Sequence, residues 1–416
     1  MKTRPPAGFA LVITLVLLAL LVLAVLALSA LTKVSSETSL TGVHQARARQ
    51  NALLALSVGL GELQRHAGDD ARLTGMAGLT GIAPLAANST RHWCGVWRND
   101  GSFVTWLVSG AQPATAALQA GVPALELISN GTVGAATANS EHVIAGKIAV
   151  PIAETPGAPG NNAITGYCAY VICDEGVKTS AFSPPPVVVT PPVIYAATTG
   201  NAQGRLRDAL ATYAASTSKV LSYEQLSLLP TPAAALTPST LQDNFHHTTL
   251  TNRLVSGALL PSGCFNVNTT SAIAWRNLLQ TYNTAPGATT SLPSATVSAR
   301  GTTMQNGLAV FSTPGKAANG PFTSTAAFVT YLATLFPITA SPSFTQIMTA
   351  LGPMLTVRSD TFRIRAYGDA LNPADAAKVE AVAYCEAIVQ RTPDTMPGFG
   401  RRFVITSFRW LGPDDI

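Results

Sequence analysis

Charged residues are scarce in this chain, and their scarcity argues against some classes of partner. Asp, Glu, Lys and Arg make up 11% of the 416 residues, well below the usual quarter. The formal net charge is +5, and Lys2 and Arg4 contribute to it, so the rest of the chain is closer to neutral. No segment combines a basic patch with interleaved aromatic side chains, and we therefore expect no nucleic-acid partner.

The chain also lacks the motifs of common enzyme families. It contains no GxSxG, no HExxH, no Walker loop and no GxGxxG after a predicted strand. We therefore expect a protein that is not an enzyme and that uses no cofactor. His246 and His247 form the one histidine pair in the sequence, and Asp243 precedes them. We interpret this segment as a surface turn and predict no metal site.

Cysteine is rare and is not arranged in a metal-binding pattern. There are five cysteines, and the odd number leaves at least one thiol unpaired within a monomer. Cys168 and Cys173 do not have CxxC spacing, and no zinc-ligand pattern occurs. We expect buried apolar thiols, with room for one disulfide.

What the sequence does have is one long apolar run close to its first residue. From Phe9 to Thr32 only three hydroxyl side chains interrupt it, so the run exceeds the about 20 residues that a helix needs to cross a bilayer. Two basic residues and no acidic one precede it, which favours a cytoplasmic N-terminus. The run is longer than the roughly 7–15 apolar residues of a cleaved secretory signal.

A helical pattern continues beyond this run. Residues 33–67 contain no proline, and Gly68 with the acidic pair that follows it indicates a stop. The spacing predicts one helix from about Phe9 to His66, roughly 85 Å long. Its second half would pack on a domain through apolar residues near helical spacing, namely Val43, Ala46, Leu53, Leu54, Leu56, Leu60 and Leu63.

The N-terminus resembles the type IV pilin and pseudopilin superfamily, whose mark is a short basic leader ending in Gly, then Phe, then an unbroken apolar helix. The resemblance implies that a prepilin peptidase cuts between Gly8 and Phe9 and that Phe9 is N-methylated. It also implies a bacterial inner-membrane protein with a short cytoplasmic N-terminus and a periplasmic or extracellular domain. The helix would first anchor the subunit in lipid and later bundle with other subunits in a filament.

One position departs from the family pattern. Most pilins carry Glu at the fifth residue of the mature chain, where this sequence has Ile13, followed by Thr14. In a filament, the freed α-amine, with a pKa of about 7.7–8.0, is neutralised by the Glu of an adjoining subunit. A subunit without Glu cannot offer this pair to a neighbour above it, which favours a place at the filament tip. Tip-type minor pseudopilins such as general secretion pathway protein K lack the same Glu.

The first half of the remaining chain reads as strands. Residues 91–108 predict a hairpin around the turn Asn99-Asp100-Gly101, with Trp93, Trp97 and Trp106 packing across the strands. Residues 164–178 predict a strand that ends in a solvated turn at Asp174-Glu175-Gly176. Residues 183–193 hold five prolines and predict an extended linker.

The second half begins with helices and ends with strands. Ser and Thr side chains suited to N-caps precede helical patterns within residues 264–280, 321–336 and 341–355. Residues 359–370, 377–392 and 400–411 alternate apolar with polar side chains, which predicts a three-stranded antiparallel meander. On its middle strand a partly solvated face is expected, formed by Lys378, Glu380, Glu386 and Gln390.

Internal blocks extend the family resemblance. YCAYVICDEGVK, FNVNTTSAIAWRNLL, PFTSTAAF and LTVRSDTFRIRAYGDA occur in the order expected of a K-type pseudopilin. The chain resembles most closely the Verru_Chthon cassette protein A family, which shares the apolar N-terminus and the arginine-rich last strand. The Asn-Leu-Asn run that often follows the Asp-Glu turn in K-type proteins is replaced by TSAFSP, which argues against a calcium site of that family.

These patterns predict an α+β fold: a long transmembrane-plus-amphipathic N-terminal helix and an antiparallel β-sheet domain with an inserted, mostly helical and loop-rich region. The expected segments are a leader (1–8), a transmembrane helix (9–32), its amphipathic extension (33–67), a β-rich first part (68–182), a Pro-rich linker with the insertion (183–357) and C-terminal strands (358–416).

The expected function is that of a non-enzymatic minor pseudopilin that primes or caps a filament of the type IV pilus or type II secretion kind. Its partners would be other minor and major pseudopilins, inner-membrane lipid and prepilin peptidase. The alternative is a membrane-tethered surface binding or adhesion protein that uses the N-terminal helix only as an anchor.

Overall fold

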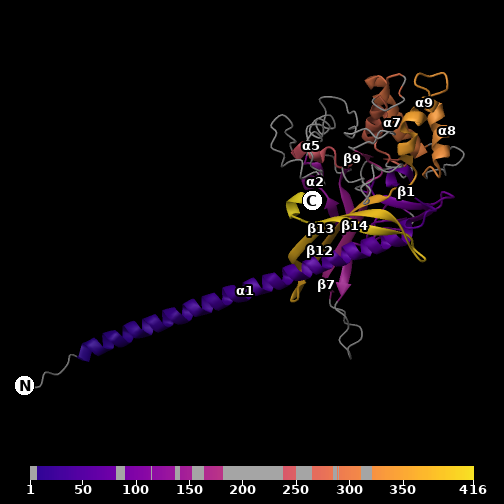
Figure 1. The fold of residues 1–416 in the computed structure, drawn as a ribbon. Coiled ribbons are helices and arrows are strands. Elements are labelled where there is room, and N and C mark those ends of the chain that lie inside the picture. The colour runs from indigo at the N-terminus through magenta and orange to yellow at the C-terminus, as the bar shows by residue number, and fades with distance from the viewer. Residues whose placement is uncertain are drawn as a thin grey trace, which may run out of the picture.

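The computed structural model describes residues 7–80, 90–113, 115–135, 141–151, 164–180, 238–249, 265–283, 288, 290–310 and 321–416. The predicted α+β class is confirmed (Figure 1): one long N-terminal helix, an antiparallel sheet and a set of inserted helices. The Pro-rich linker predicted at 183–193, most of the predicted leader, and Cys264 lie outside the described residues.

The N-terminal helix α1 (Ala7–Ala67) has 61 residues, close to the predicted bounds, and at 1.5 Å per residue it is about 90 Å long. Its N-terminal half projects away from the rest of the protein, and its C-terminal half lies along the sheet (Figure 1). No proline interrupts the helix, and it ends where Gly68 passes against the backbone of Phe399, an approach that leaves no room for a Cβ atom.

The main sheet has five antiparallel strands in the order β14-β13-β12-β7-β6. The predicted C-terminal meander is confirmed, because β12, β13 and β14 pair consecutively. Strand β7 pairs with the other side of β12 and so joins the chain before the insertion to the chain after it. The strands are β6 (Ile148–Pro151), β7 (Ile164–Asp174), β12 (Thr361–Asn372), β13 (Asp375–Met396) and β14 (Gly400–Leu411).

Smaller sheets pack against the main sheet, and part of the β2–β3 hairpin also reaches the core that contains α1. The predicted hairpin at 91–108 is confirmed as β2 and β3, and its three tryptophans are buried. β1 extends this hairpin, and β4 pairs with β5. The bounds are β1 (Arg72–Met76), β2 (Cys94–Arg98), β3 (Phe103–Trp106), β4 (Ala124–Ile128), β5 (Val143–Gly146), with η1 (Ala77–Thr80) and α2 (Asn130–Val133) between them.

The insertion is helical and has its own core. Helix α6 begins after Ser271, whose hydroxyl accepts from the Ala274 backbone N–H, and α8 begins after Ser324 in the same way, as the sequence predicts. Aromatic side chains fill the space between the helices, among them Trp275 and Phe328. The helices of the insertion are α5 (Pro238–Gln242), α6 (Ala272–Tyr282), α7 (Ser294–Val310), α8 (Thr325–Leu335), α9 (Phe344–Leu351) and η4 (Gly352–Met354), while η5 (Pro413–Asp415) follows β14.

One short parallel strand pair joins this insertion to the rest of the protein, and a second joins two segments within it. They are β8 (Thr179–Ser180) with β9 (Thr248–Thr249), and β10 (Phe265–Asn266) with β11 (Leu355–Thr356). Asn266 and Asn268 brace the second pair, since both side chains donate to the carbonyl oxygen of Thr74. The insertion is therefore fastened to the rest of the protein by the β8–β9 pair and by the hydrogen bonds to Thr74.

The core between α1 and the sheet is built from small helix residues. The buried face of α1 consists of Ala48, Asn51, Ala52, Ala55, Leu56, Gly59, Leu63 and Ala67. The predicted packing residues Leu56 and Leu63 are buried and Leu60 is partly so, but the prediction was wrong for Val43, Ala46, Leu53 and Leu54, which are exposed. The smallest side chains face the sheet because its strands approach the helix backbone directly: Gly368 of β12 lies against the backbone of Ala48 and Ala52.

Two further predictions of solvation were wrong. Asp174 and Glu175, expected in a solvated turn, are buried, and so are Glu386 and Gln390 on β13. Only the outer part of the predicted polar face, Lys378 with Glu380, reaches solvent. Cysteines 94, 168, 173 and 385 are buried and free, which agrees with the expectation of buried thiols.

Candidate functional site

The N-terminal half of α1 is a bare apolar surface. Every side chain from Leu11 to Val43 is exposed, and the helix is long and apolar enough to cross a membrane by length and composition. The hydroxyl of Thr14 donates to the carbonyl oxygen of Leu11 at 2.9 Å, and Thr32 makes the same kind of bond inside the helix. These polar groups therefore need no water, which suits a segment surrounded by lipid or by other apolar helices.

The residues predicted for processing and assembly all lie on this half. Gly8 and Phe9 belong to the first turns of α1, although the structure describes no side chain before Leu11. Ile13 is 44% exposed and, like Thr14, forms part of the bare surface. The structure places these residues close together at one end of the helix.

The C-terminal half of α1 is fixed to the sheet by polar side chains that the sequence reasoning missed. Asn51 donates to the carbonyl oxygen of Asp369 at 2.7 Å, within a buried interface. Gln64 donates to the carbonyl oxygens of Phe399 and Arg401 and accepts from the backbone N–H of Phe403. The sequence signal that could have revealed these contacts is a polar residue at helical spacing from the small residues of the buried face.

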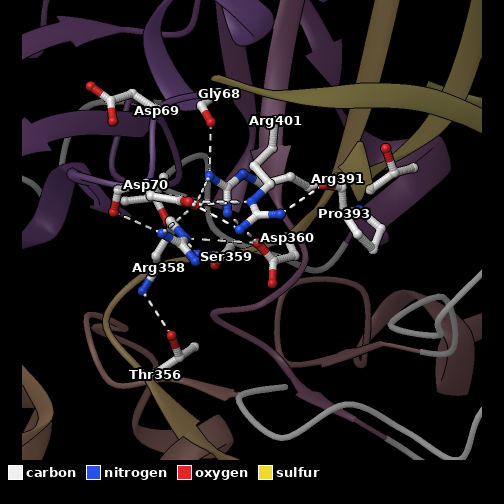
Figure 2. Close-up of polar contacts among 12 residues, drawn as sticks. Gly68, Asp69, Asp70, Thr356, Arg358, Ser359, Asp360, Arg391, Pro393 and Arg401 are labelled. Carbon is white, nitrogen blue, oxygen red and sulfur yellow. Dashed lines mark hydrogen bonds and ion pairs between the residues drawn. The ribbon is translucent and has the colours of Figure 1, made fainter. Parts of the chain in front are cut away.

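A cluster of charges fastens the chain just after α1 (Figure 2). Asp70 accepts from the guanidinium groups of Arg358, Arg391 and Arg401, which come from the segment between β11 and β12, from β13 and from β14. Asp360 also forms ion pairs with two of these arginines, Arg358 and Arg391. Hydrogen bonds from Arg401 and then Arg391 lower the pKa of Asp70, although its carboxylate is 57% exposed and partly screened by water.

A second charged network lies on the face of β12 away from α1, and its members are buried except for Arg409, whose side chain is 28% exposed. Glu386 pairs with Arg363, Arg365 and Arg409, and Arg363 also reaches Glu175 at 3.0 Å. Burial alone would raise the pKa of Glu175, but its ion pairs with Arg363 and Lys178 outweigh burial and hold that pKa at about 2. Alternate residues of β12 thus face either α1 or this network, and both faces of the strand are buried.

Three loop residues form a further polar group. His92 Nε2 lies 2.8 Å from Glu141 Oε2, and His246 Nε2 lies 2.7 Å from the carbonyl oxygen of Glu141. The prediction of a surface turn at His246 was wrong, because this side chain is buried against His92. Asp243, considered with it from the sequence, is exposed and is not in the group. Burial lowers the pKa of both imidazoles well below the usual value, so both are neutral near pH 7.

The apolar helix is exposed, while the charged networks are engaged in holding the helix and the strands together. Comparisons with protein-family models, with curated proteins and with solved structures found no match to this chain.

Proposed function

We propose that the chain is a non-enzymatic minor pseudopilin, of the kind that primes or caps a type IV pilus-like or type II secretion-like filament. The observation that carries the proposal is the division of α1 into a bare apolar half and a half seated on an antiparallel sheet. A continuous helix of this kind can first lie in the inner membrane and later pass into a bundle of equivalent helices without refolding. Lipid and a helix bundle offer the same apolar surroundings.

The location of the domain follows from the same helix. Lys2 and Arg4 precede the apolar half, so the positive-inside rule favours a short cytoplasmic N-terminus with the sheet domain in the periplasm or outside the cell. The partners are then other minor and major pseudopilins, inner-membrane lipid and prepilin peptidase.

The side chain of Ile13 supports a place for this subunit at the filament tip. An apolar side chain there cannot neutralise the α-amine of a subunit above, and a charged amine among apolar helices is costly unless it is paired. A tip subunit has no such neighbour. Ile13→Glu should therefore allow the protein to enter the shaft. The share of this subunit found along the shaft, rather than at the tip, should be higher for the variant than for the native chain.

The test of the whole proposal is the N-terminal residue of the mature protein, measured by mass spectrometry of the membrane fraction with and without the host's prepilin peptidase. We expect a chain that begins at Phe9, carries an N-methyl group and depends on the peptidase. An intact N-terminus in both strains would support the membrane-tethered binding protein instead. A start near Ala30 would mean that the helix is removed, and the filament proposal would be wrong.

The tip assignment has a separate measurement. Labelling of the native subunit on isolated filaments should give signal at one end only. Labelling along the whole shaft, at a stoichiometry like that of the major subunit, would contradict the tip assignment while leaving the pseudopilin proposal in place.

A further inference from the structure

Three residues that are far apart in the sequence meet beside the main sheet. His92 lies just before β2, Glu141 lies just before β5, and His246 lies in the turn between α5 and β9. One potential ligand atom from each residue lies within 4.8 Å of the other two. Among the described residues, this is the group of His, Cys, Asp and Glu side chains with the spacing that a metal ion needs.

The ligand atoms of the group lie near the spacing of a zinc site, but the two rings must turn to bind one ion. The imidazole rings stack with centroids 3.6 Å apart and an interplanar angle of 4°, and parallel rings cannot both point an in-plane nitrogen lone pair at the same ion. Binding would therefore rotate at least one of the two rings out of the stack. In a tetrahedral site with Zn–N bonds of about 2.0–2.1 Å, two ligand atoms are roughly 3.3 Å apart. His92 Nε2 and Glu141 Oε2, now hydrogen-bonded at 2.8 Å, would have to separate by only about half an ångström.

The surroundings of the group also fit a metal. Arg91 holds Glu141 Oε1 at 3.0 Å and leaves Oε2 facing the histidines, which is how outer groups commonly orient a ligating carboxylate. His92 Nδ1 is buried and has no hydrogen-bond partner among the described residues. A ligating imidazole normally donates this second N–H to an acceptor, and His92 borders a small cavity of about 10 Å³, enough for roughly one water.

We propose that His92, Glu141 and His246 form a binding site for a divalent transition-metal ion, with Zn²⁺ as the best fit. Two imidazole nitrogens and one carboxylate oxygen are ligands that Zn²⁺ prefers over Ca²⁺ or Mg²⁺, which select oxygen. Glu141 has a side chain that is 20% exposed, so water can supply a fourth ligand.

The site would pin one segment of the insertion to the sheet domain. His246 belongs to residues 238–249, while His92 and Glu141 belong to loops that lead into strands β2 and β5. Phe245, next to His246, already stacks on the cations of the buried network, with the guanidinium carbon of Arg365 5.0 Å from its ring. A bound ion would add a metal link to this cation–π contact and hold the segment in place.

The experiment uses the full chain in detergent after removal of metal with a chelator. Titration with ZnCl₂ should give one ion per chain and a rise in the unfolding temperature, because an ion that binds only the folded state stabilises it. Titration with CoCl₂ should give the visible absorption of tetrahedral cobalt bound to nitrogen and oxygen. His246→Gln and His92→Gln should each weaken the zinc affinity more than about 100-fold.

His142→Gln is the matched control, since His142 is also buried and hydrogen-bonded to a glutamate, Glu126, but lies outside the group. Its zinc affinity should equal that of the native chain. Unfolding curves without metal establish that each variant folds.

Two outcomes would overturn the proposal. One is the absence of stoichiometric zinc on the native chain. The other is a zinc site that survives both histidine substitutions and is lost in Cys94→Ser or Cys173→Ser, which would place the ion on the thiols across the cavity.

Discussion

The two halves of α1 are one continuous helix with opposite relations to the rest of the protein. The N-terminal half carries large aliphatic side chains on all sides and packs on nothing, whereas the C-terminal half presents alanine and glycine to a sheet. The difference teaches that side-chain size on the buried face decides how close a helix lies to its partner. Large side chains suit lipid and helix bundles, while small ones let the helix backbone touch β12.

The largest expected effect comes from breaking this close approach. In Gly368→Val, the new side chain would meet the backbone of Ala48 and Ala52, which cannot move without lifting the helix from the sheet. We expect a loss of about 4 kcal/mol in the free energy of unfolding, or failure to fold. Denaturant unfolding of the full chain in detergent measures it, and an unchanged midpoint would show that the helix does not depend on this contact.

The second-largest effect is expected in the exposed N-terminal half of α1. Leu21 is 63% exposed near the middle of the apolar run, so Leu21→Arg should cost about 2.5–3.5 kcal/mol in membrane insertion and leave the sheet domain folded. Leu54→Arg, on the exposed face of the packed half, is the matched control and should insert normally. Fractionation of membranes after alkaline washing distinguishes the two. Equal retention of both variants would argue against a membrane span at Leu21.

Two glycines in the packed half allow a comparison on the same helix. A Cβ atom at Gly59 would lie 3.1 Å from Tyr170 and 3.3 Å from Ile364, whereas Gly61 has nothing within 4 Å. Both substitutions to leucine gain helix propensity, so their difference reports packing. Gly59→Leu should lose about 1–3 kcal/mol, and Gly61→Leu should gain up to about 1 kcal/mol. Thermal unfolding of the two variants checks the sign of their difference in stability. Equal midpoints would place Gly59 outside the interface between helix and sheet.

The sequence allowed the fold to be predicted best where one pattern dominates. The length of α1, the meander at the C-terminus and the capped helices α6 and α8 follow from hydrophobic runs, alternation and N-cap hydroxyls. The face of α1 that packs was misjudged, because the prediction followed the large residues Leu53 and Leu54 rather than the small ones. α7 was also missed, since its Ser, Thr and Gly content gives a weak helical pattern.

Polar residues were the main source of error at the candidate sites. Glu386 and Gln390 were assigned to a partly solvated face because polar side chains alternate with apolar ones along this strand and usually face water. The burial of Glu386 depends on Arg363 and Arg365 of the neighbouring strand, and such partners are visible only in three dimensions. The same holds for His92, Glu141 and His246, whose spacing in the sequence follows no metal motif.

The smallest effect concerns the charges at the end of α1. Asp70→Asn removes the carboxylate shared by Arg358, Arg391 and Arg401, but its exposure limits the expected loss to about 1 kcal/mol or less at pH 7. The matched control is Asp69→Asn, because Asp69 is about equally exposed, its carboxylate accepts from the Ala71 backbone N–H, and its one ion pair among the described residues is with Arg72, at 4.0 Å. This control should change the free energy of unfolding by less than about 0.5 kcal/mol.

The pH dependence gives the sign of the Asp70 contribution. The arginines lower the pKa of Asp70 in the folded state, so its stabilisation is fully present above the unfolded pKa of about 3.9 and is lost as the pH falls through the lower folded value. The difference between the native chain and Asp70→Asn should therefore be constant from about pH 5 to 7 and shrink below about pH 4. Urea unfolding at several pH values measures it, and a difference that grows toward acid would mean that Asp70 contributes through its shape rather than its charge.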